Sequence, residues 1–189
     1  MAFNNPASKF ERAFRQFLIQ QGAATEADCF IANDSRSRNI LPNRTIIVVA
    51  FSPKNFFRSE GTCHVQIQHR FPALVQPGET NPDAQRIQMD AYLGDTIDSM
   101  VCGDGQSLEL VADAITKAGR WLAQPDGTPE GAAIAQNNLD MANFRCDWIK
   151  QVQPFLTRGQ SEIEPGGDKT FWAEILNFSA FVSTASIPN

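Results

Sequence analysis

Residues 171–183 read FWAEILNFSAFVS, and this stretch decides the fold that the sequence predicts. Its residue types sort onto alternate positions, a period of two that is typical of a β-strand. One set of positions is mostly apolar, from Trp172 to Val182, whereas the other turns polar at Asn177 and Ser179. We therefore expect one side of the strand to pack in the core and the other to be partly hydrated.

A second apolar run, Phe144–Val152, precedes this strand, and the polar segment Thr157–Lys169, rich in Gly and Glu, separates the two. Two consecutive strands joined in this way predict an antiparallel C-terminal hairpin over residues 144–183. Neither run contains a His or a pair of nucleophile and base, so the hairpin indicates no reaction.

The segment between the two runs is a candidate contact with a partner. Its Pro165-Gly166-Gly167-Asp168 sequence supplies the glycines of tight turns, and nearby charges suit the register of a protein contact. The charged candidates are Glu162, Glu164, Asp168 and Lys169. A plain solvent-exposed hairpin is the alternative.

The N-terminal half predicts one helix and a second hairpin. Phe10, Phe14 and Phe17 recur at helical spacing, which predicts an amphipathic helix of about 15 residues packed on a sheet. The β-branched run Thr45–Phe51 predicts a strand covered on both faces or nearly so. The alternating run Thr62–Phe71 predicts the next strand, antiparallel to the first.

Two histidines lie in the second strand of this hairpin. His64 and His69 fall on opposite faces, because their spacing is odd for a period of two, so they cannot bind one metal ion from this strand. We expect His64 to be exposed, His69 to be a flanking or interface residue, and neither to be catalytic.

The polar segment Asp34–Asn39 predicts an exposed loop before the first strand. The loop and the residues that follow it carry Arg36, Arg38 and Arg44, which are suited to contact phosphate or an acidic partner. A solvated loop without a partner is the alternative.

The middle of the chain, residues 81–124, predicts two helices. Asn81 is a candidate N-cap for the first, Pro82 fits its first turn, and Asp104-Gly105 marks the break before the second. The following segment, Asp126–Leu139, predicts a loop with one short helical turn.

Composition bounds the class of protein. The 189 residues suit one domain, and 42% hydrophobic with 20% charged residues is typical of a folded globular chain. A net charge of −5 gives no sign of the basic stripe that wraps nucleic acid. The N-terminus lacks the pattern of an export signal, and no run approaches the ~18 apolar residues that span a bilayer.

The cysteines carry no metal or redox motif. Cys29, Cys63, Cys102 and Cys146 are isolated from one another, with no C-x-x-C pair and no His cluster nearby. This spacing argues against a zinc site and against a dense disulfide framework. We expect reduced, mostly buried thiols.

The order helix, strand, strand, helix pair, strand, strand predicts one α+β domain over residues 1–189. We expect two layers, a mostly antiparallel four-stranded sheet with helices packed on one face. Apolar positions such as Phe171, Ile175 and Phe181 fall on the other face of the last strand and indicate a partner surface. A symmetric homo-oligomer is the simplest partner.

This arrangement resembles the tail terminator, or tail completion, proteins of long-tailed bacteriophages. The resemblance covers roughly residues 9–184. It rests on the element order, on a strand of the Phe-Arg-Cys-Asp-Trp-Ile type, on the Gly-rich hairpin loop and on the final strand that begins Phe-Trp-Ala-Glu. Two features depart from a compact family member: the second helix in the middle and the extra loop over residues 124–143.

The resemblance implies a structural virion protein without catalytic residues or cofactors. Such a protein forms a hexameric ring that caps the tail tube, with the head–tail connector on its other side and DNA passing through the lumen. It is assembled in the host cytoplasm and stays in the virion.

Other classes of protein fit parts of the same pattern. Another neck connector protein, or a cytoplasmic protein-binding module, would share the antiparallel sheet. An enzyme such as a small hydrolase needs a motif that the sequence lacks, namely Gly-x-Ser-x-Gly, His-x-x-x-His or a Cys with a His partner in sequence context. We therefore expect no enzymatic activity, no metal and no membrane partner.

Overall fold

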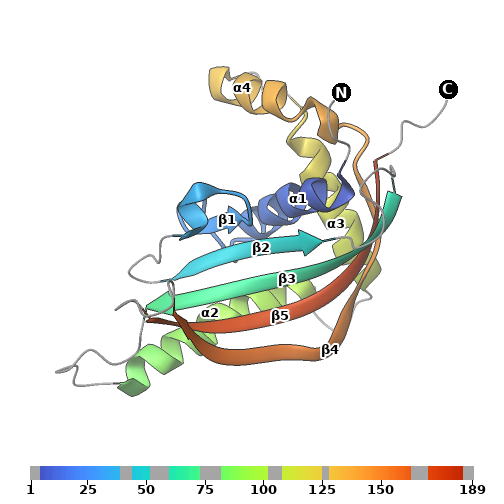
Figure 1. Cartoon of the computed structure of the whole chain (residues 1–189). Coiled ribbons are helices and arrows are strands. Elements are labelled where there is room, and N and C mark those ends of the chain that lie inside the picture. Colours follow the sequence, from blue (N-terminus) through green and yellow to red (C-terminus); the bar gives the residue numbers. More distant parts are fainter. Residues whose placement is uncertain are drawn as a thin grey trace.

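A computed structural model describes residues 5–38, 44–51, 60–72, 82–101, 108–124, 128–162 and 170–184 (Figure 1). In chain order, its helices, 3₁₀ turns (η) and strands are α1 (Pro6–Gln20), β1 (Cys29–Ile31), η1 (Ser35–Arg38), β2 (Thr45–Phe51), β3 (Glu60–Pro72), α2 (Pro82–Val101), α3 (Leu108–Trp121), α4 (Pro129–Asn137), η2 (Leu139–Met141), β4 (Arg145–Glu162) and β5 (Thr170–Ser183).

The strands form one five-stranded sheet in the order β1-β2-β3-β5-β4. Both predicted hairpins are present, β2 with β3 and β4 with β5, and antiparallel pairing of β3 with β5 joins them in the middle. The α+β class is therefore confirmed. The expected four antiparallel strands are corrected to five in a mixed sheet, because β1 pairs in parallel with β2.

Helices cover one face of the sheet, as expected. In Figure 1, α1, α2 and α3 lie behind the strands, whereas no helix crosses in front of them. Alternate residues of the strands point into this layer and are buried against the helices, among them Ile46, Val48, Cys63, Val65, Ile67, Leu176, Phe178, Ala180 and Val182. We call this side the inner face and the opposite side the outer face.

The contact between α1 and α3 forms the centre of the core. Phe10, Phe14 and Phe17 stack in a file along α1, with ring centroids 5.4 and 5.7 Å apart, and all three are buried. The helices approach closely at Gly119 of α3, where an added Cβ would lie 2.8 Å from the Cβ of Ala13. The absence of a side chain at this position therefore sets the distance between the helices.

Strand β4 is longer than the predicted run over residues 144–152 and pairs with β5 as far as Glu162. Its register shifts between Cys146 and Trp148 and again between Gln151 and Leu156. Such irregularities break the period of two, and Pro154 is tolerated because β4 is an edge strand. The sequence pattern therefore ends before the strand does.

The predicted short turn after residue 126 is instead the helix α4. Thr128 caps it by accepting a hydrogen bond from the backbone N–H of Gly131 (3.0 Å), and Pro129 occupies the first turn. In Figure 1, α4 stands away from the sheet, beyond α1. The two predicted middle helices are present as α2 and α3, whereas Asn81 and the break at Asp104-Gly105 lie outside the described residues.

Candidate partner-contact site

A row of side-chain amides linked by hydrogen bonds lies on the outer face. Arg70 donates to Gln68 Oε1 (2.8 Å), Gln68 donates to Gln66 Oε1 (3.1 Å), and Gln66 donates to Asn177 Oδ1 (3.3 Å). The Asn177 amide in turn donates to the backbone carbonyl of Pro154 on β4 (3.0 Å). The outer face thus presents an ordered, mostly uncharged polar strip that links β3, β5 and β4.

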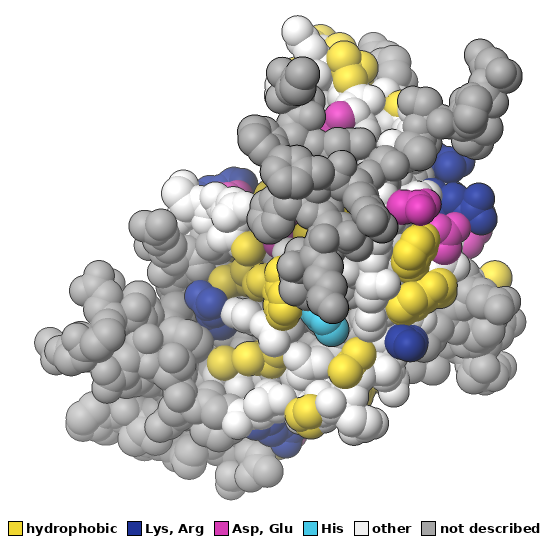
Figure 2. Space-filling model, turned by 45° about the vertical axis from the view of Figure 1, so that its right-hand side comes forward, with side chains coloured by type: hydrophobic (Ala, Val, Ile, Leu, Met, Phe, Trp, Pro, Cys, Tyr) yellow, Lys and Arg dark blue, Asp and Glu magenta, His cyan; other side chains and the backbone are white. Residues whose placement is uncertain are grey.

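Aromatic side chains border this strip. On one side the Phe51 ring lies 5.6 Å from the His64 ring, and Phe51 is 49% exposed. On the other side Trp148 stacks on Phe181 at 6.2 Å, with the Lys150 ammonium 5.0 Å from the Trp148 ring. Figure 2 shows hydrophobic side chains scattered among polar ones on this side of the molecule. Trp148 and Phe181 are half-buried, so Phe51 is the exposed aromatic of this border, and aromatic side chains are enriched in protein contacts.

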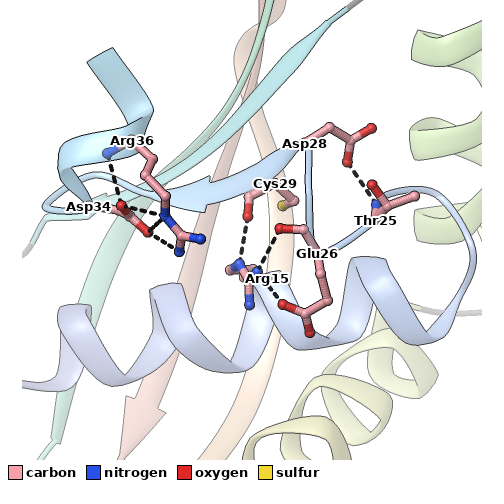
Figure 3. Close-up of polar contacts among 7 residues, drawn as sticks. All are labelled: Arg15, Thr25, Glu26, Asp28, Cys29, Asp34 and Arg36. Carbon is pink, nitrogen blue, oxygen red and sulfur yellow. Dashed lines mark hydrogen bonds and ion pairs between the residues drawn. The ribbon is translucent and has the colours of Figure 1, made fainter. Parts of the chain in front are cut away.

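Among the arginines proposed from the sequence, Arg36 lies where expected. Its side chain is exposed at η1 and turns back onto Asp34, with Nη2 2.6 Å and Nε 3.1 Å from Asp34 Oδ2 (Figure 3). Hydrogen bonds from Arg36 hold the pKa of Asp34 below its ordinary value. Arg38 belongs to the same turn, but its side chain is outside the described residues.

The prediction that Arg44 is an exposed loop residue is wrong. Its Nε donates to Asp28 Oδ2 (2.8 Å), its guanidinium lies 4.1 Å from the centre of the Tyr92 ring, and the residue is only 7% exposed. An arginine is buried in this way when an ion pair and an aromatic face both hold it. Arg44 therefore fixes α2 to the sheet and is not presented to a partner.

The charged residues proposed at the hairpin loop are only partly placed. Glu162 is the last residue of β4 and pairs in register with Thr170, but its side chain is outside the described residues. Glu164, Asp168 and Lys169 also lie outside them. The structure therefore shows only the two ends of this loop, at Glu162 of β4 and Thr170 of β5.

A hollow of about 240 Å³ lies between α1, the β1–η1 segment, the end of α3 and α4. We call it the arginine hollow, because Arg12, Arg15 and Arg36 line it together with Trp121 and Ile134. In the sequence, Arg12 and Arg15 lie between the Phe positions of the first helix, and nothing connects them with Arg36. No local pattern could have done so, since the lining comes from four separate segments.

Acidic and carbonyl oxygens fix the other two arginines of the hollow. Arg15 donates through Nε to the Cys29 carbonyl (2.6 Å) and through Nη2 to Glu26 Oε2 (2.6 Å), as Figure 3 shows. Arg12 donates to the Asn138 amide oxygen (2.9 Å) and forms an ion pair with Asp140. The guanidinium groups are therefore held in place before any ligand arrives.

The prediction that His69 flanks the core or an interface is also wrong. The ring is fully buried, stacks 6.2 Å from the Phe71 ring, and has no hydrogen-bond partner for either nitrogen among the described residues. Burial lowers its pKa to about 3, and the nearby Arg44 acts in the same direction. His69 is thus a neutral core residue. His64 is exposed, as expected.

Glu11 is a second ionisable group in the core. Its carboxylate accepts a hydrogen bond from the backbone N–H of Ala50 (2.8 Å) at the edge of β2, beyond the end of β1. Burial raises its pKa to about 7. Glu11 therefore occupies a strand edge that would otherwise be open, and it is 3% exposed.

The described cysteines are poor candidates for chemistry. Cys29, Cys63 and Cys146 are free and buried, and burial raises the pKa of their thiols to about 12, 11 and 12. Cys102 is outside the described residues. Within the described ranges, no group of three or more His, Cys, Asp or Glu residues could hold a metal ion, and no helix is long and apolar enough to cross a membrane.

Compared with models of protein families, with curated proteins and with solved structures, the chain shows no match. The outer face and the arginine hollow are therefore the features of the molecule that bear on its function.

Proposed function

We propose that the chain is a structural subunit that assembles into a ring, with the role of a phage tail terminator. The ring caps the tail tube and joins it to the head–tail connector, and DNA passes through its lumen. The single observation that carries the proposal is an outer face that no described helix covers, on which the exposed Phe51 and the half-buried Trp148–Phe181 pair border an ordered strip of amides.

The composition of the outer face supports a contact between folded subunits. Its amides already satisfy one another, so covering them by a partner leaves few polar groups without hydrogen bonds. Phe51 and the Trp148–Phe181 pair supply apolar area at the borders. A net charge of −5 also agrees with a lumen that does not hold DNA.

Two related functions would use the same surface. A cytoplasmic protein-binding module would place one partner on the outer face without closing a ring. A neighbouring neck connector would close a ring but would bind the connector protein in place of the tail tube. Stoichiometry separates the first alternative from the proposal, and binding to isolated tail tubes separates the second.

A pair of matched variants tests the proposal. Phe51→Glu places a charge at the border of the outer face, where the side chain is 49% exposed, and should weaken self-association at least tenfold. Leu110→Glu is the control, because Leu110 is 48% exposed on α3, away from the outer face. Sedimentation velocity gives the assembled mass. Normal assembly by the Phe51→Glu chain would remove the outer face from the contact.

A further inference from the structure

We infer that the tip of the β4–β5 hairpin of one copy, residues 162–168, docks in the arginine hollow of the next copy. The inference rests on the proposed ring and names one of its contacts. It concerns a different surface from the outer face, and its occupant is a second copy of this chain.

The hollow offers cationic donors that are already positioned. Arg36 directs Nε and Nη2 to Asp34 and is 64% exposed, and its Nη1 makes no hydrogen bond with the described residues. A guanidinium has five N–H donors, so one ion pair leaves capacity for an incoming carboxylate. Arg12 and Arg15 line the same hollow from α1, one helical turn apart.

The hollow also has an apolar wall. Trp121 at the end of α3 is 36% exposed and Ile134 on α4 is 39% exposed. Large apolar side chains next to arginines favour a ligand that presents an apolar group between acids. A volume of about 240 Å³ holds roughly eight waters at ~30 Å³ each, which is room for one apolar side chain and its flanking carboxylates.

The hairpin tip has this chemistry in its sequence. Residues 162–164 read Glu-Ile-Glu, and Asp168 follows, with Lys169 as the nearest opposing charge. Ile163 between two glutamates matches the apolar wall between arginines. Each arginine of the hollow already has an acidic partner, namely Asp140, Glu26 or Asp34, so the acidic tip would bind through the remaining guanidinium N–H donors and not through a large net charge.

The positions of tip and hollow make the contact intermolecular. The hollow lies beside β1 at one edge of the sheet, whereas the hairpin belongs to β5 and β4 at the other edge. Four strand spacings of about 4.8 Å separate the two edges. A contact between two different surfaces is heterologous, so each copy gives one tip and one hollow, and the proposed ring forms when the rotation between successive copies closes.

The test uses one variant of each surface in the full chain. Arg36→Glu alters the hollow, and the double change Glu162→Arg with Glu164→Arg alters the tip. Each variant alone should be at least tenfold weaker in self-association. Lys117→Glu is the control, because it makes the same charge change at an exposed site on α3. Circular dichroism verifies that all four chains are folded.

Mixing the two variants gives the decisive result. In a one-to-one mixture the intact tip of the Arg36→Glu chain meets the intact hollow of the tip variant, and the two altered surfaces meet with reversed charges, so ring formation should recover, as measured by native mass spectrometry. Combining all three changes in one chain should restore the ring.

The outcomes separate this contact from the ring itself. A ring that forms normally from both variants overturns the tip–hollow contact and leaves the ring intact. Two defective variants that stay monomeric when mixed also overturn the contact. A wild-type chain that stays monomeric at every concentration contradicts the ring, and the contact with it.

Discussion

Gly119 shows how a single residue sets the packing of the core. A Cβ at this position would lie 2.5 Å from Cδ1 of Phe144 and 2.8 Å from Cβ of Ala13. Real Cβ atoms do not approach that closely, so α1, α3 or the Phe144 ring would have to move. No local pattern in the sequence marks Gly119 for this contact, because Ala13 and Phe144 lie far from it along the chain.

We expect Gly119→Ala to lower the free energy of unfolding by about 1–3 kcal/mol, the usual penalty for overpacking. Gly94→Ala is the matched control in α2, because nothing lies within 4 Å of its added Cβ. The control should be neutral or up to about 1 kcal/mol more stable, since alanine favours a helix. Urea unfolding of both variants measures the difference, and equal stabilities would contradict the close approach.

His69 and Glu11 have opposite effects on how the stability of the fold changes with pH. The pKa of His69 falls from 6.5 to about 3 on folding, so its contribution is present above pH 6.5 and is lost as the pH falls toward 3. The pKa of Glu11 rises from 4.5 to about 7, so its contribution is present below pH 4.5 and is lost as the pH rises through 7. Between pH 4.5 and 6.5 the two effects cancel.

We therefore expect that removing one of the two groups will leave the pH dependence of stability that the other group causes. Relative to the wild type, His69→Leu should gain stability as the pH falls from 6.5 to 4.5, by roughly 3 kcal/mol at ~1.4 kcal/mol per pH unit. Glu11→Gln should show the opposite slope. Urea unfolding at pH 4.5, 5.5 and 6.5 measures both, and a His69→Leu profile parallel to the wild type would show that His69 is not held neutral.

For single residues, burial could be predicted only where the alternation of a strand or the period of a helix shows which face a side chain is on. The exposure of His64 follows from the alternation of its strand. The burial of Arg44 depends on Asp28 and on Tyr92 of α2, which no local pattern connects with it. The neighbouring Phe71 likewise stacks on Tyr92 of α2, a contact that no local pattern connects with the strand of His69.

Among the elements, long periodic segments were predictable and short or irregular ones were not. The helix α1 and strands β2, β3 and β5 follow from their periods of 3.6 and 2. Strand β1 has three residues, too few for a period, and is a strand because β2 pairs with it. The second half of β4 is polar and follows a register shift, so its pairing with β5 was not visible in the sequence.

The described β4–β5 pairing ends one residue pair beyond the last pairing of β5 with β3, so the hairpin tip should be dispensable for folding. Deletion of residues 161–167 removes only the end of the hairpin, after the pairs that join β5 to β3. We expect the shortened subunit to keep its circular dichroism spectrum and to lose assembly. A Gly/Ser replacement of equal length controls for loop closure. Loss of secondary structure would count against an assembly role for the tip.

Different surfaces of the molecule have different properties, and their arrangement is compatible with a ring of subunits. The helices bury the inner face, the outer face carries aromatics and satisfied amides, and the arginine hollow lies at the opposite sheet edge from the hairpin. The sequence predicted a two-layer α+β subunit with a partner surface on the other face of the last strand. It could not predict the hollow, because the hollow exists only after α1, β1, α3 and α4 pack together.

The assembled mass of the purified chain tests the proposed ring most directly. Native mass spectrometry and negative-stain images over a concentration series should show one closed species of fixed stoichiometry, with a central hole, beside the monomer. A monomer at all concentrations up to the millimolar range, or an open ladder of masses without a preferred size, would contradict the ring.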